Sequence, residues 1–224
     1  MTYRWNFAPV WANADVLLAG ALGTLRLFAI CTAVALAAGL AVGLARGSPR
    51  RWLGWPARAF VEFFRNTPVL VQILWFYFAL PILTGVSVNP FFAAALGISL
   101  NSAAFTAEIV RGGIASIDRG QWEAGRALGM THPQAMRRLV LPQAFRRMLP
   151  AFTNRGIEIF KMTTLASAVA YVELLQQGKL LASIDFNPIE IYTVIAVVFF
   201  LCLLPMVQAS YALERRLARV DRPA

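Results

Sequence analysis

Five long apolar stretches constrain this chain more than any other feature of its sequence. They cover about residues 22–45, 60–82, 91–111, 152–173 and 189–211. A bilayer core takes roughly 20 mainly apolar residues per helix, so each stretch is long enough for one membrane span. The chain is 58% hydrophobic and 14% charged, with a mean hydropathy of +0.60, which excludes an ordinary soluble domain. We predict an all-α membrane protein with five transmembrane helices, in a single domain over residues 1–224.

The basic residues gather in three of the segments that border these stretches. Four arginines follow the first stretch, seven follow the third and four follow the fifth, which together make fifteen of the 21 basic residues. They are Arg46, Arg50, Arg51 and Arg58; Arg111, Arg119, Arg126, Arg137, Arg138, Arg146 and Arg147; and Arg215, Arg216, Arg219 and Arg222. Basic residues in short connections mark the cytoplasmic side. The sequence therefore predicts a periplasmic N-terminus and a cytoplasmic C-terminus.

Small residues suggest how the first span packs. Ala35, Gly39 and Gly43 recur at a spacing of four, which would allow another helix to approach closely. Cys31 and Cys202 both lie inside apolar stretches, where a free cysteine behaves as a small hydrophobic residue. We therefore expect no structural disulfide.

Residues 112–149, called the arginine-rich loop below, are predicted to form two short helices. Asp118 has the character of an N-cap for the first helix, and Gly129 is a typical helix stop. Thr131 with Gln134 three residues later, beside Pro133, predicts the start of the second helix.

Two further residues of this loop, Pro142 and His132, bear on its shape and chemistry. A proline costs about 3 kcal/mol inside a helix, so Pro142 is expected to bend the second helix near its middle. His132, the only histidine, is expected to have a surface or capping role rather than a catalytic one. The sequence offers no nucleophilic triad, no metal-ligand cluster and no Gly-x-x-x-x-Gly-Lys-Ser/Thr phosphate loop. We expect no catalytic residue, no metal site and no ATP hydrolysis by this chain.

The arginine-rich loop and its flanks resemble a known family. Glu123-Ala124-Gly125, Gly129 and Leu139-Val140-Leu141-Pro142 resemble the EAA loop of ABC importer permeases. Four further segments resemble the polar amino acid branch, which includes histidine, glutamine and glutamate/aspartate permeases. They are Phe64–Gln72, Ala107–Ile114, Gly120-Gln121 and Lys161–Leu165, and the whole match runs from about Gly20 to Arg215.

The resemblance implies a type I ABC importer permease fold in a bacterial inner (cytoplasmic) membrane. It also implies several partners: cytoplasmic ABC ATPase subunits that hold ATP and Mg, a periplasmic substrate-binding protein, and a second permease as a homodimer or related heterodimer. Membrane lipid surrounds the chain, and neither a nucleic acid nor a cofactor of its own is expected. The EAA loop of the family is a coupling helix, which assigns ATPase coupling here to Gly120, Glu123, Ala124, Gly125, Gly129, Leu141 and Pro142. Gly125 replaces the usual alanine and is expected to loosen the helix by about 0.5–1 kcal/mol.

Polar residues inside the apolar stretches are candidates for the substrate pathway, because a charge near the membrane centre costs roughly 2.5–3.5 kcal/mol and needs a partner or a task. Glu62 with Arg65, and Glu108 with Arg111, are spaced to pair along a helix. The proposed pathway residues are Arg65, Asn66, Thr67, Gln72, Asn101, Glu158, Lys161 and Thr163. Hydrogen bonding between helices is the alternative interpretation for the uncharged ones.

The predicted cargo is a polar or charged L-amino acid. Arg155, Glu158 and Lys161 recur every three residues, which gives a net positive stripe suited to a carboxylate and favours glutamate or aspartate. Residues 177–181 resemble part of a glutamate/aspartate permease, whereas Met162 stands where the family often has an acidic residue. Two other classes stay open: an ATP-independent transporter or channel, and a membrane-tethered nucleic-acid binder suggested by the basic helix-turn-helix. Pro142 and the topological cause of the positive charge argue against the latter.

Overall fold

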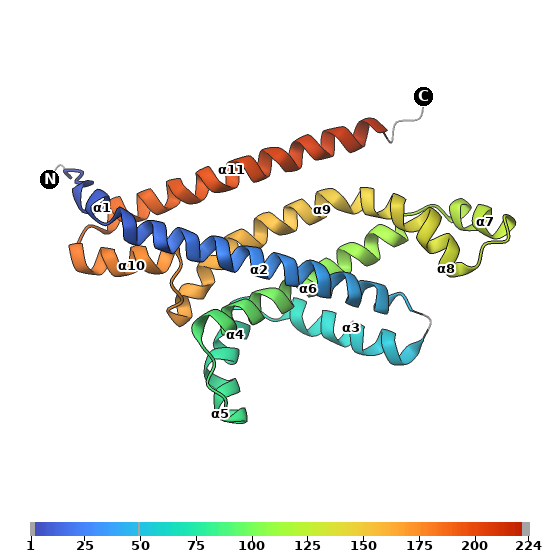
Figure 1. Ribbon diagram of the computed structural model, residues 1–224, viewed down its shortest axis with the longest axis horizontal. Coiled ribbons are helices and arrows are strands. Elements are labelled where there is room, and N and C mark those ends of the chain that lie inside the picture. Colours follow the sequence, from blue (N-terminus) through green and yellow to red (C-terminus); the bar gives the residue numbers. More distant parts are fainter. Residues whose placement is uncertain (1–2, 49, 221–224) are drawn as a thin grey trace. The chain divides into compact units, whose positions relative to one another are not determined.

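The computed structural model describes residues 3–48 and 50–220, and within these ranges the chain forms helices and turns without a strand (Figure 1). The α-helices are α1 (Ala8–Ala12), α2 (Ala14–Arg46), α3 (Arg51–Asn66), α4 (Val69–Leu74), α5 (Leu80–Thr84), α6 (Pro90–Ala115), α7 (Arg119–Ala127), α8 (His132–Ala135), α9 (Leu141–Met162), α10 (Leu174–Asp185) and α11 (Pro188–Val220). Two π-helical turns (Trp75–Ala79 and Met136–Val140) and one 3-10 helix (Thr163–Val169) complete the list. The predicted all-α class is confirmed.

Among the described residues, three helices are long and apolar enough to cross a bilayer: α2, α6 and α11. The pair formed by α3 and the segment Val69–Thr84 adds a fourth if it counts as one span, and it bends by 104°. Pro68 lies at the break with an extended backbone (ψ 132°). The fifth expected span, 152–173, is not among these helices. Its residues divide between the charged end of α9 and the 3-10 helix.

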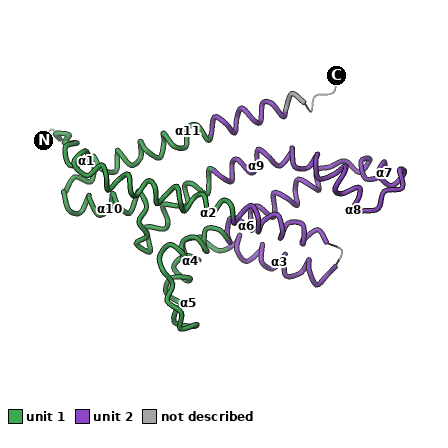
Figure 2. The backbone as a smooth tube through the Cα atoms, in the orientation of Figure 1, with its two compact units in different colours: residues 1–33, 67–99, 157–206 green, residues 34–66, 100–156, 207–224 purple. Residues whose placement is uncertain are grey.

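The chain divides into two compact units, which Figure 2 colours separately. Unit 1 comprises residues 1–33, 67–99 and 157–206, and unit 2 comprises residues 34–66, 100–156 and 207–224. Each unit draws on segments that are distant in the sequence. This is possible because α2, α6 and α11 each contribute residues to both units.

Unit 1 has an apolar core in which α1, α10 and the first half of α11 meet. Its buried members are Val10, Leu174, Leu181, Ala182, Ile191 and Ile195. Gly178 makes this packing possible, because a Cβ there would stand 1.9 Å from Cδ1 of Ile195. The N-terminal segment is fastened to the same region, since the Tyr3 hydroxyl donates to the Glu190 carboxylate at 2.6 Å.

In unit 2 the second half of α2 packs closely against α6. A Cβ on Gly39 would stand 2.4 Å from the Thr106 Cβ, and a Cβ on Gly43 would stand 2.8 Å from the Val110 Cβ. Ala35, one step earlier in the same series, is fully buried. The close approach predicted from the four-residue spacing is confirmed. The two cysteines are free, as expected.

Candidate functional site

The first helix of the arginine-rich loop is fixed at both ends by its own residues. The Asp118 carboxylate accepts a hydrogen bond from the Gly120 amide at 2.6 Å, which caps α7. At the other end Gly129 has a φ of +70°, and its amide donates to the Arg126 carbonyl at 2.9 Å. The next amide, that of Met130, reaches back to the carbonyl of residue 125 at 3.0 Å. This is a Schellman end, which requires the left-handed conformation that glycine adopts without strain. Both sequence predictions are confirmed.

The second helix begins as expected but does not end as expected. Gln134 accepts from the Thr131 amide at 2.9 Å in a capping box, with Pro133 in the first turn. From there α8, a π-helical turn and α9 follow without a break to Met162. The prediction that this helix is short is wrong, whereas the expected bend at Pro142 stays a prediction. The extra residue of the π turn, in which the Leu141 amide donates to the Met136 carbonyl, accommodates the proline just inside α9.

The inner side of the loop is packed. Val110, Ile117, Val140, Ala144 and Met148 form its buried core. Gly125 is also buried, and a Cβ there would lie 3.1 Å from the Leu139 Cδ1 and 3.2 Å from the Ala135 Cβ. The missing methyl therefore permits close contact between α7 and the second helix, rather than only loosening α7 as the sequence suggested.

Polar and aromatic contacts reinforce this packing across the loop. The amide of Gln143 donates to the Gln121 side chain at 3.0 Å, and the Arg147 guanidinium donates to the Ser116 carbonyl. The His132 ring stacks on Trp122, with centroids 5.0 Å apart and planes 13° apart. His132 thus packs against α7 at the turn of the loop, and the expectation that it is not catalytic stays a prediction.

The outer side of α7 is open to solvent. Its exposed residues are Arg119, Gly120, Gln121, Glu123, Ala124, Arg126 and Ala127, followed by Leu128 and Gly129. Leu128 is 73% exposed although it is a large apolar residue, and small residues flank it. Glu123 lies 3.9 Å from Arg126 with two thirds of its side chain exposed. An exposed helix face with acidic and basic side chains beside a large apolar one is well suited to docking against a partner.

The seven residues assigned to coupling are therefore not equivalent. Gly120, Glu123, Ala124, Gly129 and Pro142 are exposed, Leu141 is half-buried and Gly125 is buried. The exposed ones are available for contact, whereas Gly125 acts within the chain. Their docking role stays a prediction.

A second polar site in unit 2 is built around Arg155, whose residue is only 5% exposed. Its guanidinium donates to the Asn101 side-chain oxygen at 3.2 Å and to the Ser102 hydroxyl at 2.9 Å. It also lies over the Phe105 ring, 4.4 Å from the centroid. Asn101 in turn donates to the Phe64 carbonyl at 2.7 Å. The Asn-Ser pair inside an apolar stretch was the sequence signal for this site, but the role of Arg155 in holding it required the structure.

Arg65 joins the same site from α3. Its guanidinium lies 5.1 Å from the centroid of the Phe105 ring and 3.7 Å from the Glu108 carboxylate. Glu108 also pairs with Arg46 and, at 2.9 Å, with Arg111, which confirms the predicted Glu108–Arg111 pair. One carboxylate thus meets three guanidinium groups, so the site carries excess positive charge.

The predicted pair of Glu62 with Arg65 is replaced by other contacts. Glu62 lies 3.6 Å from Arg46 and accepts from the Asn66 amide at 3.2 Å. The reason is geometric: the end of α2 brings Arg46 to Glu62, while Glu108 of α6 takes Arg65.

The remaining pathway candidates lie in unit 1. The Gln72 amide donates to the Thr67 hydroxyl at 2.6 Å, and the buried Thr163 hydroxyl donates to the Phe160 carbonyl at 2.7 Å. Glu158 and Lys161 are exposed on α9. The Thr163 hydroxyl is thus satisfied three residues back along the chain, at the end of α9, rather than by a bond to another helix as the alternative interpretation held.

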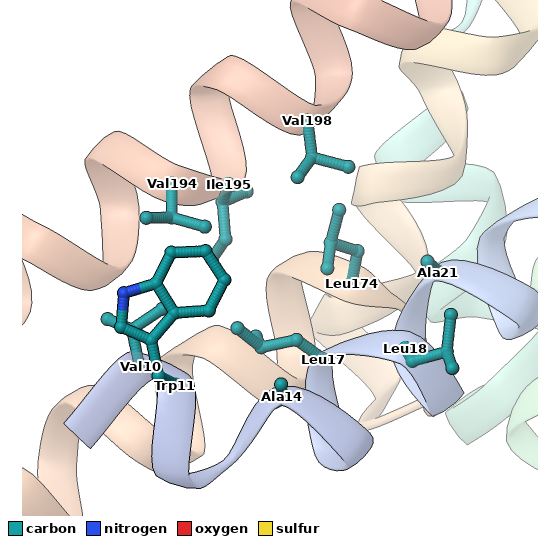
Figure 3. A pocket seen from close by; sticks show the side chains of 10 residues that line it. All are labelled: Val10, Trp11, Ala14, Leu17, Leu18, Ala21, Leu174, Val194, Ile195 and Val198. Atoms are coloured by element: carbon teal, nitrogen blue, oxygen red, sulfur yellow. The ribbon is translucent and has the colours of Figure 1, made fainter. Parts of the chain in front are cut away.

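Unit 1 also contains a hollow of about 240 Å³, which Figure 3 shows from close by. Side chains from α1, α2, α10 and α11 converge on it, and all of them are aliphatic or aromatic. They are Val10, Trp11, Ala14, Leu17, Leu18, Ala21, Leu174, Val194, Ile195 and Val198. A zwitterionic ligand needs charged or polar groups to orient it, so this hollow is a poor candidate for a cargo site.

Comparison with known proteins covers nearly the whole chain. The family of binding-protein-dependent transport system inner membrane components matches residues 16–219. The glutamine transport system permease protein GlnP of Escherichia coli (strain K12) is 36% identical over 96% of this chain and 98% of its own length. The arginine transport system permease protein ArtQ of Bacillus subtilis (strain 168) is 32% identical over 96% of this chain and 99% of its own length.

Solved structures agree with this relationship. An amino acid ABC transporter crystallised with histidines superposes with a TM-score of 0.90 at 31% identity, over 96% of this chain and 100% of its own. The MetNI methionine ABC transporter superposes with a TM-score of 0.74 at 24% identity, over 94% and 99% respectively, which shows a shared fold.

Proposed function

Since this chain belongs to the family of binding-protein-dependent transport system inner membrane components, we propose that it is the permease subunit of an ATP-driven importer of a polar amino acid. In this role the chain forms part of the membrane pathway and leaves ATP hydrolysis to a separate subunit. The absence of a phosphate loop from its sequence supports that division of labour.

One observation carries the proposal: the arginine-rich loop is packed on one side and open on the other. Capping at both ends of α7 and the buried Gly125 hold the helix firmly. Glu123, Ala124 and Leu128 then face outward on a surface that can transmit movement without deforming. We propose that a cytoplasmic ABC ATPase subunit docks on this surface.

The remaining partners follow from this role. A periplasmic substrate-binding protein delivers the amino acid, and a second permease, identical or related, completes the pathway. ATP and Mg bind to the ATPase subunits, and this chain holds no cofactor. The distribution of arginines supports an inner-membrane location with the N-terminus in the periplasm and the C-terminus in the cytoplasm.

The cargo is proposed from the polar site rather than from the relatives, whose names include glutamine, arginine, octopine and L-cystine. Arg155 contacts an amide and a hydroxyl, and Glu108, which pairs with Arg65 of the same site, also meets two further arginines. Positive charge of this kind favours a carboxylate-bearing ligand. We propose that Arg65, Asn101 and their pathway companions guide such an amino acid, with glutamate or aspartate as first candidates.

The docking proposal is tested by Glu123→Lys in the assembled transporter. Reversal of this exposed charge is expected to lower substrate-stimulated ATP hydrolysis and uptake at least about tenfold, which corresponds to about 1.4 kcal/mol of coupling. Glu214→Lys on α11 reverses a charge outside the loop and serves as the control. Unchanged uptake by Glu123→Lys would contradict the docking role, and uptake without any associated ATPase would favour an ATP-independent transporter.

The cargo is tested by competition in proteoliposomes that contain the binding protein. Glutamate, aspartate, glutamine, histidine and arginine are each added in excess over a labelled amino acid. Inhibition by glutamate and aspartate alone is the expected result. Inhibition by arginine or histidine instead would refute the acidic cargo but leave the permease role intact.

A further inference from the structure

The turn between α2 and α3 contains a hollow of about 550 Å³ that no step of transport uses. It is lined by Ser48, Arg51, Gly54, Trp55 and Arg58, all within unit 2. The phosphate of a phosphate ester could accept hydrogen bonds from the two guanidinium groups and the hydroxyl. Its glycerol linkage could pack against the indole.

The spacing of these residues places them on one face of α3. Positions 51, 54, 55 and 58 follow the three- and four-residue steps of a helix, so the two arginines lie about two turns apart on the same side. Gly54 lies between them and is buried, and a Cβ there would stand 3.6 Å from the Ser48 carbonyl oxygen. The hollow is therefore floored by backbone at its centre and is basic at both ends.

Within the part of the chain that the structure describes, no ion pair neutralises the charge of this hollow. The sequence from 47 to 61 contains no acidic residue. The first one, Glu62, is turned toward Arg46 at 3.6 Å. Among the ion pairs of the described residues, none involves Arg51 or Arg58. A negatively charged ligand could therefore pair with Arg51 and Arg58.

The surroundings of the hollow point to a membrane surface. It directly follows α2, a helix apolar enough to span a bilayer. Trp52 and Trp55 are 69% and 75% exposed, and α3 as a whole is strongly amphipathic. Tryptophan is enriched at the headgroup level of membranes, and each arginine near an anionic surface contributes about 1 kcal/mol of attraction. A soluble phosphate would gain nothing from two exposed indoles.

We propose that this hollow binds the phosphate headgroup of an anionic phospholipid from the cytoplasmic leaflet. Arg51 and Arg58 contact the phosphate oxygens, Ser48 offers a hydroxyl, and Trp55 lies against the glycerol and upper acyl region. The site goes beyond the proposed transport function, because it involves neither cargo nor nucleotide. It would anchor the turn at a fixed depth in the membrane.

The test measures quenching of Trp55 fluorescence by brominated lipid in vesicles that contain the full chain. Brominated phosphatidylglycerol and brominated phosphatidylcholine are compared at equal mole fraction, and Trp55→Phe supplies the signal of the other tryptophans for subtraction. The wild-type chain is expected to be quenched at least about twofold more by phosphatidylglycerol, since two arginine contacts favour the anion.

Two matched double variants assign the preference to the hollow. Arg51→Gln with Arg58→Gln should quench equally with both lipids, whereas Arg215→Gln with Arg216→Gln, which removes two exposed arginines from α11, should keep the preference. Retained quenching by phosphatidylcholine shows that the helix is still at the interface. If the double variant does not insert, each single variant is expected to lose part of the preference.

Three results would overturn the proposal. The first is equal quenching of the wild-type chain by both lipids, and the second is a preference that survives loss of both arginines. The third is removal of the preference by excess inorganic phosphate at constant ionic strength, which would assign the hollow to a soluble phosphate. None of these results bears on amino acid uptake, so the transport function is tested separately.

Discussion

The arginine-rich loop and the α10 connection (residues 170–187) begin their helices with the same chemistry in opposite surroundings. In the loop, Asp118 caps α7 from an exposed position. In the connection, Glu173 is completely buried and accepts from the amides of Leu175 at 2.9 Å and Gln176 at 2.6 Å. Both carboxylates satisfy helix N-termini, but only one does so in water.

The consequence is visible in how each segment meets its neighbours. The α10 connection is joined to α2 by two hydrogen bonds between a hydroxyl and a backbone group: the Thr24 hydroxyl accepts from the Leu174 amide at 3.1 Å, and the Tyr171 hydroxyl donates to the Gly23 carbonyl at 3.1 Å. The loop is closed by side chains on one face and leaves the other free. The arginine-rich loop, which we propose binds a partner, keeps one face exposed. The α10 connection packs only within unit 1, and even its capping carboxylate is buried.

The largest effect is expected from Gly23→Ala. A Cβ at this position would stand 2.0 Å from the Val172 carbonyl oxygen, which is backbone and has little room to move. We expect a loss of about 3 kcal/mol or more, the upper end of overpacking effects, measured by thermal unfolding in detergent.

Gly156→Ala provides the control for this change. No atom lies within 4 Å of a Cβ there, so the variant should be stabilised by about 0.5–1 kcal/mol through the better helix propensity of alanine. Equal stability of the two variants would mean that the connection is not held by backbone contact.

The next effect concerns pH and the buried cap. Burial raises the pKa of Glu173 from its ordinary 4.5 to about 7, against the opposing influence of the Leu175 and Gln176 amides and of Lys179. Because the folded pKa lies above the unfolded one, the connection is most stable below pH 4.5 and loses stability as the pH rises from there to about 7. The loss is at most about 3 kcal/mol, which hydrogen exchange of the first α10 amides would report.

Glu173→Gln is expected to remove this pH dependence while keeping one acceptor for the cap. Asp118→Asn is the matching substitution in the loop. Because Asp118 is exposed, this substitution should leave the hydrogen exchange of the α7 amides unchanged. A pH profile of α10 that survives Glu173→Gln would assign the titration to another group.

Local signals in the sequence predicted much of this arrangement. Asp118, Gly129 and Gln134 act within a few residues of themselves, so their roles could be assigned from spacing alone. The four-residue series ending at Gly43 likewise marked a real helix contact. The π turn before Pro142 and the continuation of the second helix beyond residue 149 to Met162 could not be predicted, because both depend on the packing around them.

The polar site shows the same limit over longer distances. Spacing along α3 favoured a Glu62–Arg65 pair, but Arg46 and Glu108 arrive from other helices and compete for both partners. Which of the possible ion pairs forms depends on how the helices pack, and this packing cannot be read from spacing along one helix. The burial of Glu173 could not be predicted for the same reason, since it depends on α2 packing against residues 172–174.

The smallest effect separates two influences on the loop itself. Gly125→Ala should gain about 0.5–1 kcal/mol of helix propensity, as the sequence alone suggests. It should also lose a similar amount, because the new methyl would stand 3.2 Å from the Ala135 Cβ, which cannot rotate away, and 3.1 Å from the Leu139 Cδ1, which can. We therefore expect a net change within about 0.5 kcal/mol in thermal unfolding.

Gly112→Ala isolates the propensity gain, because no atom lies within 4 Å of a Cβ at this position in the last turns of α6. Its stabilisation, compared with that of Gly125→Ala, measures how tightly α7 is held against the second helix. If the two substitutions stabilise the protein equally, α7 can move away from the second helix at no cost in free energy. Its exposed face could then not transmit a partner's movement. A smaller gain at Gly125 is what a rigid docking element requires, because the stiffness that resists one methyl also resists deformation under load.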